Sequence, residues 1–496
     1  MARDTAPTHV KEPSYADAIV PLITLTVLIG SSVFLFGTAA MDGPMQVALI
    51  LCSMVVALIL LKNGHSWDSI VEAGQKSLSS ITTPIFILLS VGALIGAWNM
   101  SGTIPTLAFY GIQLLRPSFL YLATAVICGL ISLGCGSSWT TAGTVGVALI
   151  GIATLAGASP AITAGAVISG AYLGDKLSPL SETTVLTAQL AEVDIHAHIR
   201  AMFWTAGPSF LVAMIVFALL GIKMSGLASS GYIASELSKL DQLFWITPLN
   251  LIPLVLLVVL SIRKVPASLA ILFSALLAGV MAALLQPEAT LRFVNDPSLS
   301  KPVAYAKGIW SALANGYRAN TGIGEVDRLL SRGGMSSMLK TLWIVIGAVT
   351  FGTLLEEFHL IGKLVNPLLT RARSTGRLIA TVVATAFGLN IVTADQYIAL
   401  VLPARMFRAE FQRRGLKAQN LSRACADAGT VTSPLVPWNS CGAFMAVTLG
   451  VATLQYLPFC IFNIAAPLFS MLWGFTGFKI ERIQSVEASP EPVTTH

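Results

Sequence analysis

Apolar segments of about twenty residues follow one another along most of this chain, separated by polar connections. A helix needs about 20 apolar residues to cross the hydrocarbon core of a bilayer, so each of these segments predicts a membrane span. Charged residues make up only 11% of the 496 residues, compared with about 25% in soluble domains. We therefore expect an all-α polytopic membrane protein with about ten full spans.

Polar segments between the spans carry further information. Residues 63 to 80 place apolar and charged side chains with helical spacing, which predicts an amphipathic helix at the membrane interface. Residues 481 to 496 are polar, and we expect a disordered tail there. Eight of the full spans are expected near residues 16 to 36, 44 to 62, 82 to 98, 201 to 221, 246 to 262, 266 to 285, 340 to 357 and 453 to 475.

The formal net charge of +6 fits a protein of the inner (plasma) membrane. Loop lysines and arginines face the anionic cytoplasmic leaflet, so no nucleic-acid partner is expected. The six cysteines are scattered through apolar segments without a Cys-x-x-Cys pair, so neither a disulfide framework nor a zinc site is predicted. We expect no cofactor and no enzymatic activity.

Charged residues interrupt the apolar sequence most sharply between Gly170 and Thr187. Asp175, Lys176 and Glu182 lie in this stretch, and a charged side chain at the bilayer centre costs roughly 3 kcal/mol on insertion scales. Pro179 removes a backbone donor and frees carbonyl oxygens that can bind a small cation. The stretch is therefore predicted to form a buried functional site.

A second copy of this break indicates a duplicated architecture. The sequence Ser-Pro-Leu at residues 178 to 180 returns at residues 433 to 435, which is 255 positions further on. At the same offset Thr140 corresponds to Asp395, and each lies in a polar interruption of an apolar run. Paired broken segments at corresponding positions are the best sequence pointer to the substrate site of a transporter.

The two polar interruptions predict re-entrant helical hairpins in the runs 118 to 157 and 378 to 404. Loops on both sides of the second run are rich in arginine and lysine, whereas those beside the first run hold only Arg116. Equivalent elements with opposite charge bias indicate inverted-topology repeats. The basic segment 286 to 339, which this topology places outside, does not follow the charge rule, and long loops obey that rule poorly.

These repeats define the expected domains. Residues 1 to 221 form a first transmembrane repeat, residues 222 to 245 a linker, and residues 246 to 480 a second transmembrane repeat. Each repeat contributes one re-entrant hairpin and one helix broken at Ser-Pro-Leu, so two hairpins come in addition to the full spans.

The sequence from Gly170 to Thr184, Gly-Ala-Tyr-Leu-Gly-Asp-Lys-Leu-Ser-Pro-Leu-Ser-Glu-Thr-Thr, resembles the signature of the NhaC-type sodium/proton antiporters of the ion-transporter superfamily. Residues 394 to 397 with 403 to 407, and residues 427 to 442, resemble the same family. This resemblance implies a secondary transporter, and relatives of this type include exchangers of malate against lactate. Where the signature often has Asp followed by Thr-Thr-Asn, this chain has Glu182 followed by Thr-Thr-Val.

Two carboxylates are the main candidates for binding sodium and coupling protons. Asp175 is the first, because one carboxylate can hold either a hard cation or a proton. Its alternative is a buried ion pair with Lys176, although adjacent residues point apart on a helix. Asp395 is the second, and its alternative role as the N-cap of a helix at 396 to 407 is compatible with ion binding.

Further oxygen ligands are expected from the same breaks, because a sodium site needs neutral or acidic oxygens around its carboxylate. Alternatively, each of these side chains caps a broken helix. The candidates are Glu182, which is also a coupling candidate, Thr140, Ser178, Thr183, Ser433 and Asn439.

Three charged residues are candidate charge partners in the site. Lys176 is expected either to occupy the carboxylate when sodium leaves or to snorkel to the membrane interface. Arg405 is expected to pair with Asp427, to neutralise an anionic substrate, or to snorkel.

His196 and His198 share a short polar segment with Asp194. Histidine titrates near neutral pH, so both are candidate sensors of cytoplasmic pH. The polar context favours the alternative, a solvated loop.

These residues favour a secondary active transporter that exchanges sodium for protons by alternating access. Its expected partners are sodium ions, protons and the lipid bilayer, with a small organic anion and a homodimer as further candidates. The alternative is an organic-acid exchanger of the malate/lactate type that is coupled to the same ions.

Two other functional classes are less favoured. In an intramembrane hydrolase, Lys176 would activate Ser178 or Ser181. The second Ser-Pro-Leu copy lacks a corresponding lysine, and no oxyanion-type glycine loop is evident. A channel would lack saturable exchange that depends on a counter-ion.

Overall fold

The computed structural model describes residues 10–114, 117–224, 241–319, 327 and 330–483. Most of the expected linker and most of the expected tail lie outside the described residues. The regular structure of the described part is helical, apart from one isolated bridge between Leu416 and Arg482. The expected all-α class is confirmed.

The helices of the first half follow the predicted apolar runs. They are α1 (Tyr15–Phe36), α2 (Pro44–Lys62), α3 (Trp67–Ser80), α4 (Thr82–Met100), α5 (Thr103–Leu114), α6 (Leu120–Cys135), α7 (Ser138–Thr141), α8 (Val147–Leu155), α9 (Pro160–Leu177), α10 (Glu182–Leu190) and α11 (Ile195–Met224). Short 3-10 turns occupy Gly37–Asp42 and Pro117–Phe119, and the π-helical turn η3 (Ala142–Gly146) joins α7 to α8.

The described part of the second half is also helical. Its helices are α13 (Ile252–Ile262), α14 (Ala267–Leu285), α15 (Pro287–Val294), α16 (Lys301–Asn315), α18 (Leu339–Glu357), α19 (Leu360–Arg371), α20 (Thr375–Val392), α21 (Gln396–Arg413), α22 (Ala418–Cys425), α23 (Ser440–Leu449), α24 (Thr453–Tyr456) and α25 (Ile461–Thr476). The π-helical turn η6 (Ala426–Thr430) continues α22. The 3-10 turns are Pro248–Leu251, Met335–Met338, η7 (Ser433–Leu435) and Leu457–Phe459.

Seven helices in the described part are long and apolar enough to cross a membrane, namely α1, α2, α4, α11, α14, α18 and α20. A helix pair bent by 87° between Leu449 and Thr453 would be an eighth span. The predicted spans at 246 to 262 and 453 to 475 contain shorter apolar helices, Pro248–Ile262 and Ile461–Thr476. The chain is a multi-pass membrane protein.

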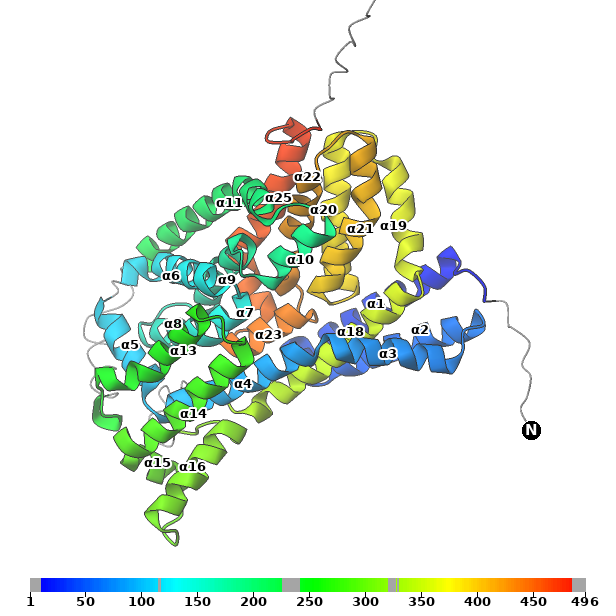
Figure 1. Ribbon diagram of the computed structural model, residues 1–496. Coiled ribbons are helices and arrows are strands. Elements are labelled where there is room, and N and C mark those ends of the chain that lie inside the picture. Colours follow the sequence, from blue (N-terminus) through cyan, green and yellow to red (C-terminus); the bar gives the residue numbers. More distant parts are fainter. Residues whose placement is uncertain (1–9, 115–116, 225–240, 320–326, 328–329, 484–496) are drawn as a thin grey trace, which may run out of the picture.

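Figure 1 shows the arrangement that these helices adopt. Helices α2, α3, α4, α14 and α18 run together as one inclined layer, with α4 packed on α14 and α18 packed on α2 and α3. A second group of helices lies on one side of this layer and consists of α6, α9, α11, α20, α21 and α25. Within this group, α25 packs against both α11 and α20. The two groups meet around the short helices α7 and α23.

Helix α9 begins and ends where its sequence dictates. Ser159 caps its N-terminus, and Pro160 occupies the first helical position, where a missing N–H costs nothing. The helix ends at Leu177, because Pro179 cannot continue it. Ser181 then caps α10, with its hydroxyl 3.4 Å from the backbone N–H of Thr184.

The same helix approaches α6 closely through two glycines. A Cβ atom added to Gly170 would lie 2.2 Å from the carbonyl oxygen of Ala125, and one added to Gly174 would lie 2.3 Å from the backbone nitrogen of Leu133. Only glycine permits this backbone contact. The position of Asp175, which follows Gly174, is therefore fixed by rigid helix packing.

Candidate functional site

A cavity of about 300 Å³ opens between the broken helices. Its wall comes from both halves of the chain. It is formed by the turn between α3 and α4 with the start of α4, the break between α6 and α7, the break between α9 and α10, the turn between α13 and α14, one residue of α18, the break between α20 and α21, and the start of α23. Five residues singled out from the sequence share this wall, namely Asp175, Asp395, Glu182, Thr183 and Thr140. The two predicted hairpins therefore converge on one polar site.

Asp175 is buried, and its carboxylate accepts hydrogen bonds from three hydroxyl groups. Its Oδ2 lies 2.5 Å from Ser138 Oγ, at the start of α7. Its Oδ1 lies 2.5 Å from Ser181 Oγ and 3.3 Å from Thr183 Oγ1. None of the ion pairs found among the described residues includes Asp175. The carboxylate is held by neutral donors at the edge of a cavity.

Asp395 lies on the same wall but has different partners. It caps α21, and its Oδ1 accepts a hydrogen bond from the backbone N–H of Ile398 at 2.9 Å. The capping role that the sequence predicted is therefore present. Asp395 also lines a second cavity of about 330 Å³, together with Thr353, Glu356 and Glu357. Asp395 therefore caps α21 and borders both cavities at the same time.

Glu182 and the threonines contact the cavity in different ways. Glu182 is exposed and accepts a hydrogen bond of 3.1 Å from the hydroxyl of Tyr397, which connects the first half to α21. Thr183 donates to Asp175 directly. Thr140 is bonded to Ser137 and not to a carboxylate, although it borders the cavity.

Three predicted ligands do not belong to the residues that line this cavity. Ser178 Oγ accepts the backbone N–H of Leu180 within the turn after α9. Ser433 donates to Gln396 Oε1 at 2.8 Å, and Asn439 caps α23 through the N–H of Cys441. The capping and turn-forming alternatives describe these three residues.

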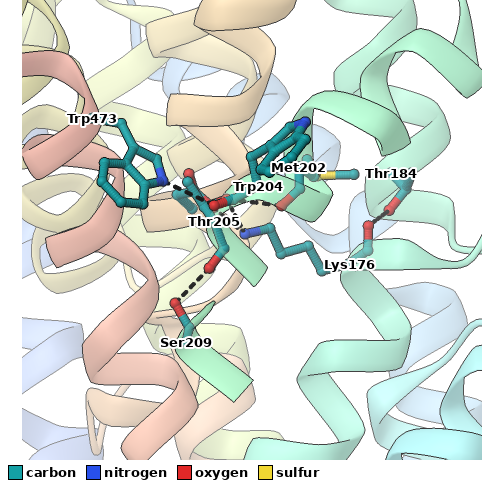
Figure 2. A network of polar contacts seen from close by, with 8 residues as sticks. Lys176, Thr184, Met202, Trp204, Thr205, Ser209 and Trp473 are labelled. Carbon is teal, nitrogen blue, oxygen red and sulfur yellow. Dashed lines mark hydrogen bonds and ion pairs between the residues drawn. The ribbon is translucent and has the colours of Figure 1, made fainter. Parts of the chain in front are cut away.

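Lys176 points away from the cavity, and the predicted snorkelling to the membrane interface is wrong. Its side chain is fully buried, so it does not snorkel. Its Nζ forms an ion pair with Asp427 of η6 and lies 3.1 Å from Thr205 Oγ1 of α11. Figure 2 shows Lys176 directed toward Thr205. Asp427 therefore pairs with Lys176, not with Arg405, which is exposed.

The histidine prediction also needs correction. His196 is exposed and His198 is completely buried, and both lie in the first turn of α11, not in a solvated loop. His198 Nδ1 lies 2.8 Å from Ser422 Oγ of α22. The packing of α11 on α22 buries His198, and local polarity of the sequence does not reveal such a contact.

Sequence reasoning missed several residues of the site. Ser138 and Ser181 provide the shortest bonds to Asp175, and Lys264 places a positive charge on the cavity wall. Ser138 lies in the polar interruption that contains Thr140, so that interruption was a usable signal. Lys264 follows a predicted span and looks like an ordinary loop lysine, so only the tertiary structure places it here.

The helix caps also change the correspondence between the two halves. Ser137 caps α7 and Asp395 caps α21, and these positions are 258 residues apart. Ser181 and Asn439, the caps of α10 and α23, are separated by the same 258 residues. By capping position, Asp395 therefore corresponds to Ser137, whereas the offset of 255 had assigned it to Thr140.

These features define a class: a multi-pass helical membrane protein with a polar cavity at the meeting point of broken helices, walled by buried carboxylates. The model of the Na⁺/H⁺ antiporter family matches residues 3–201 and 170–478. The chain belongs to the Na⁺/H⁺ antiporter family, as its sequence motifs predicted.

Curated relatives match nearly the whole chain. The Na⁺/H⁺ antiporter NhaC of Alkalihalophilus pseudofirmus is 36% identical over 89% of this chain and 92% of its own length. The malate-2H⁺/Na⁺-lactate antiporter of Bacillus subtilis is 34% identical over 94% and 96%. The arginine/ornithine antiporter ArcD of Halobacterium salinarum is 32% identical over 97% and 96%. All three are antiporters, with different cargoes.

Proposed function

We propose that this protein exchanges sodium ions for protons across the plasma membrane by alternating access, with Asp175 as the carboxylate shared by the two ions. The observation that carries this proposal is the environment of Asp175: a buried carboxylate, bordering a cavity, with three hydroxyl partners. Family membership and the sodium/proton antiporters among the relatives support it.

The hydroxyl partners suit both states of the carboxylate. A hydroxyl has one proton to donate and two lone pairs that accept. Ser138, Ser181 and Thr183 can therefore donate to the empty carboxylate and still direct lone pairs at a bound sodium ion, which prefers hard oxygen ligands. A proton on Asp175 removes the negative charge that binds sodium. Competition between the two ions at one group provides the coupling.

Asp395 is proposed to supply a second negative charge to the same cavity. The cap position holds its carboxylate at the N-terminus of α21, and the residue borders both cavities, which supports a role in attracting cations. Glu182, bonded to Tyr397, is proposed to attract cations at the cavity edge. The inverted repeats at residues 1 to 221 and 246 to 480 remain our prediction for how the cavity opens to each side.

Reconstitution in liposomes tests the proposal. Purified protein is incorporated into vesicles that contain a pH-sensitive dye, and sodium, lithium, potassium, malate and lactate are added in turn. Sodium alone should move protons in the opposite direction, with saturation, and protein-free vesicles should show no response. Proton movement that requires malate or lactate would contradict simple sodium/proton exchange.

The second candidate function is sodium-coupled exchange of a small organic acid. The cavity of about 300 Å³ is much larger than one sodium ion needs, and Lys264 on its wall offers a positive charge to a carboxylate substrate. Arg405, the residue predicted for this role, is exposed and does not belong to the lining residues of the cavity. If an organic acid is carried, Lys264→Gln should raise its apparent KM and leave sodium/proton exchange unchanged.

A further inference from the structure

Lys176, the neighbour of Asp175, forms a buried ion pair with Asp427, and a second buried cation, Arg423, precedes Asp427 on the same helical segment. Lys176 pairs with Asp427 Oδ1, while Oδ2 of Asp427 has no hydrogen-bond partner among the described residues. Arg423, one helical turn earlier, is 1% exposed, and its Nε and Nη2 also lack partners in the described part. Within the described residues its guanidinium makes one hydrogen bond, from Nη1 to the carbonyl of Lys479 at 3.0 Å.

Buried polar atoms without partners are costly, so such atoms call for an explanation. Here a donor and an acceptor of opposite charge are both unsatisfied within four residues of one helix. Residues four apart are neighbours on the surface of an α-helix. An Arg423–Asp427 pair would satisfy the atoms that are left unpaired in the present arrangement.

The local helix geometry offers a way to form that pair. Asp427 lies in the π-helical turn Ala426–Thr430, directly after the α-helical segment that contains Arg423. π-helical turns inside α-helices are rare and occur frequently at functional sites. When the turn relaxes to α-helical geometry, residues 423 and 427 gain the usual spacing of four on one face.

The π-helical turn is connected to the second hairpin. Nδ2 of Asn390, near the end of α20, lies 2.7 Å from the carbonyl oxygen of Gly429 and 3.3 Å from that of Ala428. These bonds satisfy backbone oxygens of the wider turn. A movement of α20 and its hairpin, which carries Asp395, would therefore change the support of the turn.

The ion pair is also connected to Asp175. Lys176 follows Asp175 on α9, and the hydroxyl of Thr184 lies 2.9 Å and 3.0 Å from the carbonyl oxygens of these two residues. Figure 2 shows this contact between Thr184 and Lys176. A shift of the α9 terminus when an ion binds Asp175 would thus move Lys176 relative to Asp427.

We propose that Asp427 exchanges between two buried cations during transport: it pairs with Lys176 in the conformation described here and with Arg423 in the opposite-facing conformation. Either arrangement leaves one buried cation without a carboxylate, so the two states are similar in cost, as a bistable element requires. Lys176, Arg423 and Asp427 are positioning residues, and the inference rests on the proposed exchange of sodium and protons.

Arg423→Leu tests the exchange of partners, because it removes the second cation and leaves the Lys176–Asp427 pair. Sodium should still raise the thermal stability of the variant, since Asp175 is unchanged. Turnover per folded molecule in liposomes should fall at least tenfold. Arg423→Lys should recover part of the turnover. Arg332→Leu, which removes a half-buried arginine elsewhere, is the matched control and should retain wild-type turnover.

The alkylation rate of Cys135 serves as a readout of conformation. If Arg423 had a purely structural role, its substitution would leave the response of this rate to sodium unchanged. Cys135 is half-buried and lines the cavity, whereas the other five cysteines are buried. In the wild type, sodium should change its alkylation rate, and in Arg423→Leu this response should disappear. Turnover within twofold of wild type, or an unchanged Cys135 response, would overturn the inference.

A second variant tests the inference even if Arg423→Leu does not fold. The double variant Lys176→Met/Asp427→Leu removes both charges of the pair and with them the exchangeable partner. It should bind sodium without turnover, and wild-type turnover would contradict the proposal. Wild-type protein that shows no sodium/proton exchange would instead refute the proposed function, so the two failures are distinguishable.

Discussion

Two buried carboxylates of this protein, Asp175 and Asp427, differ in what surrounds them. Asp175 accepts hydrogen bonds from three hydroxyl groups and borders a cavity. Asp427 is paired with the ammonium group of Lys176, and neither side chain has any exposed surface. Residues 175 and 176 are adjacent, but the helix directs one to the cavity and the other into the protein interior.

The difference separates a site that can bind a cation from one that already holds a cation. Hydroxyl groups leave the negative charge of Asp175 in place, so an ion from solution can still be attracted. The Lys176 ammonium neutralises Asp427 and occupies the position that a sodium ion would need. We therefore propose ion binding by the aspartate on the cavity side of α9 and conformational coupling by the aspartate on the buried side.

The largest expected effect comes from removing the charge of Asp175. Asp175→Asn should abolish sodium/proton exchange in liposomes, because the amide cannot exchange a proton for a cation. Asp175→Glu should retain weakened exchange with a shifted pH optimum. Both variants should insert into the membrane in normal amounts. Coupled exchange by Asp175→Asn would mean that the proton and the sodium ion use other groups.

The next largest effect is on stability. Asp427→Asn leaves the Lys176 ammonium buried without a counter-charge, and breaking such a pair costs about 3–5 kcal/mol. Thermal unfolding in detergent should therefore show a strong loss of stability, which the double variant Lys176→Met/Asp427→Leu should largely recover. The exposed pair Lys307–Asp296 is the control, because water screens an exposed ion pair and Asp296→Asn should leave the thermal unfolding almost unchanged. Equal losses at both sites would contradict a buried pair.

At Asp395, one substitution can remove the negative charge and keep the helix cap, so the contributions of charge and capping can be measured separately. Asparagine is as good an N-cap as aspartate, so Asp395→Asn should retain the stability of the wild type. If the charge takes part in transport, exchange should fall at least tenfold. Asp395→Ala should lose both transport and stability, and Thr140→Ala should have little effect. A wild-type exchange rate for Asp395→Asn would restrict Asp395 to capping.

The helix breaks and Asp175 could be predicted because their signals are local. Pro179 ends α9, polar residues interrupt apolar runs, and a carboxylate in a membrane segment is too costly to lack a function. The partner of Lys176 could not be predicted, because Asp427 lies 251 positions away and nothing near either residue indicates the other. His198 shows the same limit, since its polar neighbours in sequence gave no sign that α22 buries it.

The detailed ligand set could be predicted only in part. The offset of 255 from the Ser-Pro-Leu copies matched Thr140 to Asp395, whereas the helix caps are separated by 258 residues. The difference between the two offsets moved the prediction from Ser137, the cap that directly precedes Ser138, to Thr140. Ser138 donates a hydrogen bond to Asp175, whereas Thr140 is bonded to Ser137. Spacing between repeats locates a break, and the contacts inside the break depend on where each helix begins.

The smallest expected effect is the change of sodium affinity with pH, and it tests directly whether one carboxylate serves both ions. Below the pKa of Asp175, each unit decrease in pH should weaken the apparent sodium affinity tenfold, about 1.4 kcal/mol. Above that pKa the affinity should become constant, while turnover falls because the protonated return state becomes scarce. Sodium titrations in liposomes at several pH values measure both effects. The same slope should persist in Asp395→Asn if Asp175 is the titrating group; a slope that disappears there would assign the competition to Asp395.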